Sequence, residues 1–383
     1  MLAYLDHAAT THVRPEAAAA LLAWLGEVGN PSSSHRAGQA TRVAVEEARE
    51  RVADVLGASP GDIVFTSSGT EADNLAVKGI VWGSQRLRPH VVTTAIEHEA
   101  VLGAVTWLAA RGDIRLTIVP PQPDGRVDPE RVVAAVEDDT LLVSVMAANN
   151  VTGAVNDVAM IGRALMERQV AFHVDAVQAF ATRPLDVDQL HVDALALSAH
   201  KVGGPPGVGV AYLRRGVAIA PLLHGGGQER AVRSGTMTAA LDAACGVALI
   251  AADATRPLLV GHARMLTDRL WRGLRVIGGI QRLGPEDSAH RLPSHLAVVI
   301  DGLRADDLIF ALDHAGVAAS AGAACSSGAT VANHVLDAMG IVGDASLRMT
   351  VGATSTLNEV EYALDVLTDV VPKLRARRHA AAS

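Results

Sequence analysis

Lysine is rare in this chain, and one lysine stands where an amine could do chemistry. The 33 basic side chains comprise only three lysines, Lys78, Lys201 and Lys373, the rest being arginines. Lys201 comes directly before the turn-rich segment 203–207. An amine can form an imine with a cofactor aldehyde, whereas a guanidinium stays protonated and cannot. The residue types therefore indicate Lys201 as a candidate nucleophile, with a solvated loop lysine as the alternative.

Polar side chains also follow the other predicted strands. Segment 67–70 follows strand 63–66 and opens a helix, so its backbone amides, that of Gly69 among them, and the Thr70 hydroxyl suit a phosphate. Asp175 could keep a pyridine nitrogen protonated, as the ring of pyridoxal 5′-phosphate requires. His98 could stack on such a ring or move protons. Four further candidates would contact the phosphate or the ring hydroxyl: Ser198, His200, Asn150 and Gln178.

The predicted elements place these residues at one edge of a sheet. Short apolar strands alternate with amphipathic helices from residue 37 to residue 213, which predicts an α/β fold with a mostly parallel sheet covered by helices on both faces. Ligands of such sheets bind at the carboxyl ends of the strands. Taken alone, each candidate is more often a cap or a turn former, but their joint placement favours a site. A dinucleotide loop is disfavoured, because Gly207 and Gly209 open a strand and lack the third glycine.

The pattern changes near residue 240, and the length of 383 residues favours two folding units. We expect a large cofactor-binding domain over residues 15–255. A smaller α+β domain would combine residues 1–14 with residues 256–383, including a strand near 296–300 and a helix near 305–315.

Eight segments of the chain, in order, resemble the cysteine desulfurases of the class V aminotransferase type. The resemblance extends to about residue 350 and rests on segments 4–11, 29–33, 66–71, 97–98, 173–178, 198–201, 224–230 and 233–236. It implies a fold type I enzyme that carries pyridoxal 5′-phosphate (PLP). Lys201 would then be the Schiff-base lysine, Asp175 the pyridinium partner and His98 the ring-stacking acid and base.

The resemblance also implies the remaining ligands. Thr70, Ser198 and His200 would bind the cofactor phosphate, and Thr236 would reach the phosphate of the neighbouring subunit in a homodimer. Arg348 would pair with the carboxylate of L-cysteine, next to Asn150, because a planar guanidinium suits bidentate binding.

Sulfur chemistry depends on Cys325, which lies in the small-residue segment 320–328. By the resemblance, its thiolate would take the sulfur of the cofactor-bound cysteine as a persulfide and release L-alanine. Cys245, in an Ala-rich helix, is expected to be a core residue. Three positions depart from the usual pattern of the family's first group, namely Val151, Ala199 and Ala353. The sulfur acceptor is expected to be a protein or a thiol, and its pathway stays open among iron–sulfur clusters, tRNA, DNA and a small metabolite.

Composition limits the partners and the cellular location that we expect for this protein. A net charge of −8 without a basic block argues against direct nucleic-acid binding. Two cysteines, no charged apolar leader and no uniformly apolar stretch predict a cytoplasmic protein away from the membrane. Two alternatives stay open, another PLP lyase or transaminase of the same fold, such as a selenocysteine lyase, and a catalytically silent partner or scaffold. Intact Lys201, Asp175, His98 and Arg348 argue against the silent alternative.

Overall fold

A seven-stranded sheet forms the centre of the protein in a computed structural model, which describes residues 2–321, 333–341 and 345–382. Neighbouring strands are parallel, except that β8 runs antiparallel to both β2 and β7, which confirms the mostly parallel sheet. Across the sheet the strands are β2 (Ile63–Thr66), β8 (Gly209–Leu213), β7 (Ala194–Ser198), β6 (Ala171–Asp175), β5 (Thr140–Ser144), β3 (His90–Thr94) and β4 (Arg115–Val119).

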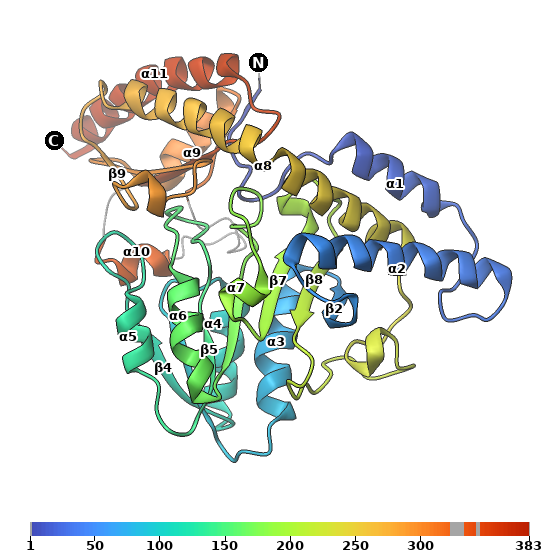
Figure 1. Cartoon of the computed structure of the whole chain (residues 1–383). Coiled ribbons are helices and arrows are strands. Elements are labelled where there is room, and N and C mark those ends of the chain that lie inside the picture. The colour runs from blue at the N-terminus through green and yellow to red at the C-terminus, as the bar shows by residue number, and fades with distance from the viewer. Residues whose placement is uncertain (1, 322–332, 342–344, 383) are drawn as a thin grey trace.

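Helices cover both faces of this sheet (Figure 1). Buried side chains of α3 (Gly69–Gly83) and α4 (Glu99–Ala110) pack on one face. The other face is covered by α2 (Arg36–Leu56), α5 (Pro129–Ala134), α6 (Val158–Leu165) and α7 (Val187–Leu190) together with part of α8. As the sequence predicts, α2 ends at Gly57, which adopts the left-handed conformation with φ of 64°.

A second apolar core lies outside the large sheet. It is built on an antiparallel three-stranded sheet of β12 (Ala345–Thr350), β10 (His295–Ile300) and β9 (Ile280–Arg282), with α9 (Ala305–His314) and α11 (Leu357–Ala382) packed on it. The N-terminal strand β1 (Ala3–Tyr4) joins this core by pairing in parallel with β11 (Val317–Ala318). The short α10 (His334–Ala338) packs instead on the core of the large sheet.

One long helix, α8 (Ala239–Leu274), contributes to both cores. Figure 1 shows it running from the group around α9 and α11 to α1 (Pro15–Leu25) and α2. The expected domain boundary at residues 255 and 256 falls inside this helix, just before Pro257, and the two-domain division stays a prediction. By length and composition α8 could cross a membrane, a test that core helices of soluble proteins also pass.

Candidate active site

Lys201 lies in a single helical turn, Ala199–Lys201, that follows β7. Its ammonium donates hydrogen bonds to the carbonyl oxygens of Ala8, at 2.5 Å, and Ala9, at 2.8 Å. The Gln178 amide donates to the same Ala8 oxygen at 3.0 Å. The N-terminal segment therefore meets the loops after β6 and β7 at the candidate lysine. Sequence reasoning missed these acceptors, because main-chain carbonyls carry no residue-type signal.

Asp175 is the last residue of β6 and is buried. Its Oδ1 accepts a hydrogen bond from the Val177 amide at 2.9 Å. Burial raises the pKa of Asp175, and electrostatic interaction with His98 and with Lys201 opposes that rise. Three strand ends, those of β3, β6 and β7, thus bring Asp175, His98 and Lys201 within electrostatic reach of one another.

His98 caps the N-terminus of α4, where its Nδ1 accepts a hydrogen bond from the Ala100 amide at 3.1 Å. His98 is therefore a helix cap through the Nδ1 edge of its ring, which is the alternative role considered for polar residues at strand ends. It is compatible with a second role on the cofactor, because the cap fixes the orientation of the ring.

The start of α3 has the features of a phosphate site. Ser68 caps the helix by accepting from the Glu71 amide at 3.1 Å. The first amides of a helix point out of its N-terminal end, where they can bind an anion. Gly69 is packed against the ends of β6 and β7, since a Cβ there would lie 2.9 Å from Val177 Cγ2 and 3.3 Å from Ser198 Cβ. Thr70 is exposed beside it.

Two other predicted phosphate ligands border this region. Burial and the charge of Lys201 lower the pKa of His200 to about 4, so its imidazole is neutral at pH 7 and has one N–H to donate. Thr236 is exposed, in a segment held to the start of α3 by an ion pair of 2.8 Å between Arg233 and Glu71.

Arg348 lies on β12 with only 2% of its surface exposed. Its Nη2 pairs with Asp6 Oδ1 at 2.7 Å, and its Nη1 donates to the main-chain oxygen of Asn150 at 2.9 Å. Its buried Nε has no hydrogen-bond partner among the described residues. The Asp6 contact is a second feature that sequence reasoning missed, although Asp6 lies in one of the segments that carry the resemblance.

Cys325 falls in segment 322–332, outside the described residues. Both flanks of that segment lie at the site. Ser320 exchanges main-chain hydrogen bonds with Arg348, at 3.1 Å and 2.6 Å. On the other side the His334 ring donates to the carbonyl oxygen of Glu97 at 2.9 Å. Cys245, in contrast, is fully buried in the core, which confirms the prediction for that residue.

Three more titratable groups are buried next to Asp175. Burial raises the pKa of Glu97 to about 8, and it raises the pKa of Asp73 well above its usual range, with further contributions from Asp175 and Glu97. Burial lowers the pKa of His173 to about 3, and its Nε2 lies 3.4 Å from Asp73 Oδ1. This layer is therefore close to neutral at pH 7.

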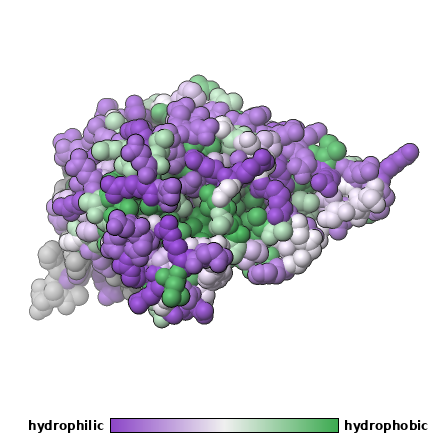
Figure 2. All heavy atoms as spheres, turned by 60° about the horizontal axis from the view of Figure 1, so that its bottom comes forward, coloured by the Kyte–Doolittle hydropathy of each residue, from purple (hydrophilic) through white to green (hydrophobic). Residues whose placement is uncertain are grey.

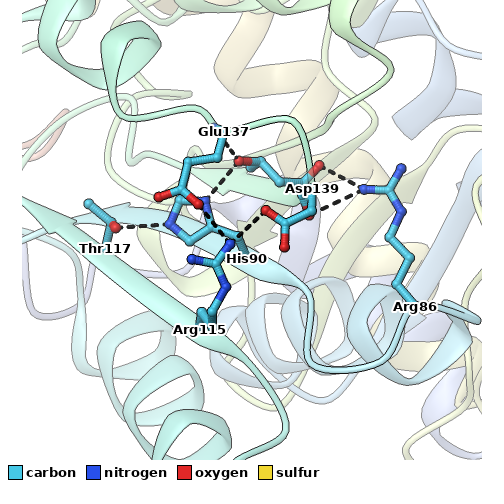
Figure 3. Close-up of polar contacts among 7 residues, drawn as sticks. Arg86, His90, Arg115, Thr117, Glu137 and Asp139 are labelled. Carbon is cyan, nitrogen blue, oxygen red and sulfur yellow. Dashed lines mark hydrogen bonds and ion pairs between the residues drawn. The ribbon is translucent and has the colours of Figure 1, made fainter.

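Far from this edge, His90, Glu137 and Asp139 have the spacing of metal ligands (Figure 3). Both nitrogens of His90 are engaged, with Thr140 Oγ1 at 2.8 Å and Thr117 Oγ1 at 2.9 Å. Both carboxylates pair with Arg115, at 2.7 Å and 2.6 Å. The cluster is thus a hydrogen-bonded ion-pair network in which both His90 nitrogens and one oxygen of each carboxylate are engaged.

Comparison with known proteins identifies the class that this fold and site define. Residues 3–363 match the family model described as Aminotransferase class-V. A curated IscS-like cysteine desulfurase of Mycobacterium tuberculosis is 43% identical over 392 aligned residues, covering 100% of this chain and 99% of the relative. The cysteine desulfurase IscS of Methanosarcina thermophila is 39% identical, covering 97% of this chain and 92% of the relative.

Comparison with solved structures leads to the same family. A NifS-like protein superimposes with a TM-score of 0.91 at 34% identity, covering 98% of this chain and 100% of that structure. DndA from Streptomyces lividans gives a TM-score of 0.77 at 35% identity, with coverages of 91% and 99%. The chain therefore belongs to the class V aminotransferase family and, within it, to the cysteine desulfurases, which are PLP-dependent enzymes.

The residues present fit this cofactor. The amine of Lys201 suits its aldehyde, the buried carboxylate of Asp175 suits its pyridine nitrogen, and the start of α3 suits its phosphate. The tight packing of Gly69 supports the fit, because any side chain there would disturb the residues on either side.

Proposed function

We propose that the enzyme converts L-cysteine into L-alanine and carries the sulfur as a persulfide on Cys325. The observation that carries the proposal is the convergence of Lys201, Asp175 and His98 at one end of the sheet, with both flanks of the Cys325 segment at the same place. The sulfur is then passed to an acceptor thiol or protein. A related solved structure, SspA in complex with cysteine, is 29% identical to this chain, which supports cysteine as the substrate.

PLP supplies an aldehyde that condenses with amines and a ring that withdraws electrons from the substrate. Lys201 would hold the cofactor and would move a proton at the substrate Cα. Asp175 would accept a hydrogen bond from the ring nitrogen and keep it protonated. Burial raises the pKa of Asp175, and electrostatic interaction with His98 and Lys201 opposes that rise, which favours its charged form.

Arg348 is proposed to bind the substrate carboxylate, with Asn150 beside it. The support is a buried guanidinium, fixed by Asp6 and by the Asn150 carbonyl, whose Nε has no partner among the described residues. A carboxylate placed on this nitrogen would satisfy a buried donor that otherwise destabilises the fold by roughly 1–3 kcal/mol.

In the sulfur step, the Cys325 thiolate attacks the substrate sulfur. A sulfur–sulfur bond forms and the carbon–sulfur bond breaks, with its electron pair left on the substrate carbon, which takes up a proton to become alanine. Cys325 comes five positions after Ser320, and a chain of that length reaches at most roughly 18 Å. The pairing of Ser320 with Arg348 supports the proposal, because it brings one end of the cysteine segment to the substrate carboxylate site.

The enzyme is proposed to act as a cytoplasmic homodimer in which Thr236 completes the phosphate site of the neighbouring subunit. Thr236 is exposed, and so are large apolar residues at and just beyond the end of α1, namely Leu22, Leu25 and Val28, which are 69%, 66% and 87% exposed. Figure 2 shows apolar residues gathered in the middle of one face, with hydrophilic residues around them. A protein–protein contact would remove such apolar surface from water.

The decisive experiment compares two cysteine variants of the holoenzyme. Cys325→Ser is expected to keep the absorbance of the bound cofactor and to lose sulfide release from cysteine with dithiothreitol. Cys245→Ser is the matched control and should retain the activity, because Cys245 is in the core of the large domain. Full sulfide release by Cys325→Ser would contradict the persulfide step, and an assay with selenocysteine would then test the selenocysteine lyase alternative.

A further inference from the structure

His334, at the start of α10, contacts the residues on both sides of His98 in the chain. Its Nε2 lies 2.9 Å from the main-chain oxygen of Glu97, and its Nδ1 lies 3.3 Å from the Glu99 carboxylate. A carbonyl oxygen only accepts hydrogen bonds, so Nε2 carries a proton and donates it. One imidazole therefore holds the chain immediately before and immediately after the residue that is proposed to act on the cofactor.

His98 lies at the end of a connection between two elements. β3 ends at Thr94 and α4 begins at Glu99, so residues 95–98 belong to neither. Connecting segments move more than the strands and helices that they join, unless contacts fix them. The capping bond from the Ala100 amide sets the ring of His98 relative to α4. The position of the ring relative to the sheet therefore depends on contacts made by its neighbours in the chain.

Glu97 makes such contacts with two different parts of the protein. Its buried carboxylate accepts hydrogen bonds from Thr94 Oγ1, at 2.6 Å, and from the Met146 amide, at 2.9 Å, which fix its side chain to the large sheet. Its main-chain oxygen is held by His334, which follows 237 positions later. The side chain and the main chain of Glu97 are thus fixed independently.

α10 gives this imidazole a fixed base. Val335 and Leu336, which follow His334, are buried in the core of the large sheet. Asn333 caps the helix by accepting a hydrogen bond from the Val335 amide at 3.1 Å. Because close packing holds the main chain that carries the ring, His334 can restrain the turn around His98 rather than move with it.

The two contacts of the ring differ in strength. The Glu99 side chain is 64% exposed, and the pair is ionic only when the imidazole carries a second proton, so this contact contributes little. The bond from Nε2 to the Glu97 oxygen needs no second proton and has the length of a normal hydrogen bond. The bond to Glu97 is therefore the contact that holds the turn.

We propose that His334 is a positioning residue for His98: by donating to the Glu97 main-chain oxygen, it fixes the turn from which His98 acts on the cofactor. This inference rests on the proposed function, because it assigns a support to one residue of that mechanism. His334 transfers no proton in the reaction and acts only through the placement of His98.

Hydrogen exchange of the apoenzyme tests this support without cofactor or turnover. The Ala100 amide donates to His98 Nδ1, and the amides of Val101 and Leu102 donate to the His98 carbonyl oxygen. His334→Ala is expected to speed the exchange of peptides covering 98–102 roughly 2–10-fold, the factor by which loss of one hydrogen bond shifts a local opening. Exchange at the wild-type rate would overturn the proposal.

Two amide variants separate the contacts of the ring. His334→Gln places an amide nitrogen near the position of Nε2, and His334→Asn places one near the position of Nδ1. The Gln variant should retain the slow exchange, whereas the Asn variant should resemble His334→Ala. Glu99→Gln is the matched control and should change the exchange little, because it removes only an exposed charge. Rescue by Asn and not by Gln would contradict the assignment of the Glu97 bond.

Kinetics of the holoenzyme show whether the support matters for the reaction. A positioned proton transfer contributes about 10²–10⁴-fold, and a displaced His98 would lose part of it, so His334→Ala should lower kcat about tenfold. The KM for cysteine should change less than about twofold, because the substrate carboxylate binds elsewhere. The visible circular dichroism of the bound cofactor should change as well.

A lower Tm with unchanged kcat and unchanged cofactor dichroism would show that His334 is merely structural, and the proposal would fail. Failure of the proposed function is recognised separately. It would appear as sulfide release by Cys325→Ser, and it would leave the exchange of residues 98–102 in the apoenzyme unaffected.

Discussion

The buried ion pair between Arg49 and Glu229 offers a quantitative test of the fold. The guanidinium contacts both carboxylate oxygens, at 2.8 Å and 2.7 Å, and their side chains are 8% and 1% exposed. Glu229 also accepts from the Phe65 amide at 3.0 Å, and Arg49 donates to the Ile63 carbonyl at 2.7 Å. The pair therefore fixes α2 and β2 to segment 229–231, whose three residues all have positive φ angles.

Glu229→Gln keeps the side-chain volume and leaves the buried Arg49 charge with only the half-exposed Glu46 as a counter-charge. Breaking such a pair costs about 3–5 kcal/mol. With an unfolding entropy of about 2.1 cal/mol/K per residue, a chain of 383 residues has roughly 0.8 kcal/mol/K, so the Tm should fall by about 4–6 °C. Arg49 also pairs with Glu46, whose side chain is 45% exposed, and Glu46→Gln should therefore cost less than about 1 kcal/mol.

Differential scanning calorimetry of the two variants at pH 7 and low salt measures this difference. The double variant Arg49→Met with Glu229→Leu should recover only part of the loss, because an apolar pair needs no counter-charge but leaves the Phe65 amide without its Glu229 acceptor. A Glu229→Gln midpoint no lower than that of Glu46→Gln would refute the assignment of this pair as the element that holds segment 229–231.

Three further outcomes are expected. Lys201→Ala should lose the absorbance of the cofactor–lysine linkage while its Tm without cofactor changes little, as ultraviolet–visible spectra and calorimetry would show. Gly209→Ala should be strongly destabilising in denaturant titration, because its Cβ would lie 2.4 Å from the main-chain carbon of Ser68, which cannot move independently. Glu97, with a pKa raised to about 8 by burial, binds its proton more tightly in the folded state, so its contribution to stability is lost as pH rises from about 4.5 to 8. Glu97→Gln should therefore gain stability over the wild type across that window, by up to a few kcal/mol at its upper end, whereas an equal pH slope in both proteins would contradict this. Burial also raises the pKa of Asp242 to about 8, and this residue contributes equally to the pH dependence of stability in both proteins.

The alternation of strands and helices was enough to predict the central sheet and its mostly parallel direction. The spacing of apolar residues and the local propensity act within a segment, so β2, β7 and the start of α3 could be predicted from their own residues. The two antiparallel pairings of β8 could not be predicted in this way, because strand direction depends on which neighbour a strand meets.

The candidate site could likewise be predicted only in part. Residue types at strand ends predicted the group of Lys201, Asp175 and His98, because a parallel sheet gathers its strand ends at one edge. The carbonyls of Ala8 and Ala9 and the pairing of Asp6 with Arg348 could not be predicted. They join residues almost 200 and more than 340 positions apart, and no local pattern encodes such distances.

The N-terminal segment has a consequence for the order of events during translation. Residues 3–6 are synthesised long before the residues with which they pair, namely Val317, Ala318 and Thr350. At 5–20 residues per second, roughly 17–70 s pass between the synthesis of this segment and that of its last partner. The Ala8 and Ala9 carbonyls reach Lys201 from the same segment, so this side of the lysine is held in place by strand pairing only after residue 350 has been made. A chain that stops before residue 317 would keep the lysine and lack the strand partners that hold this segment.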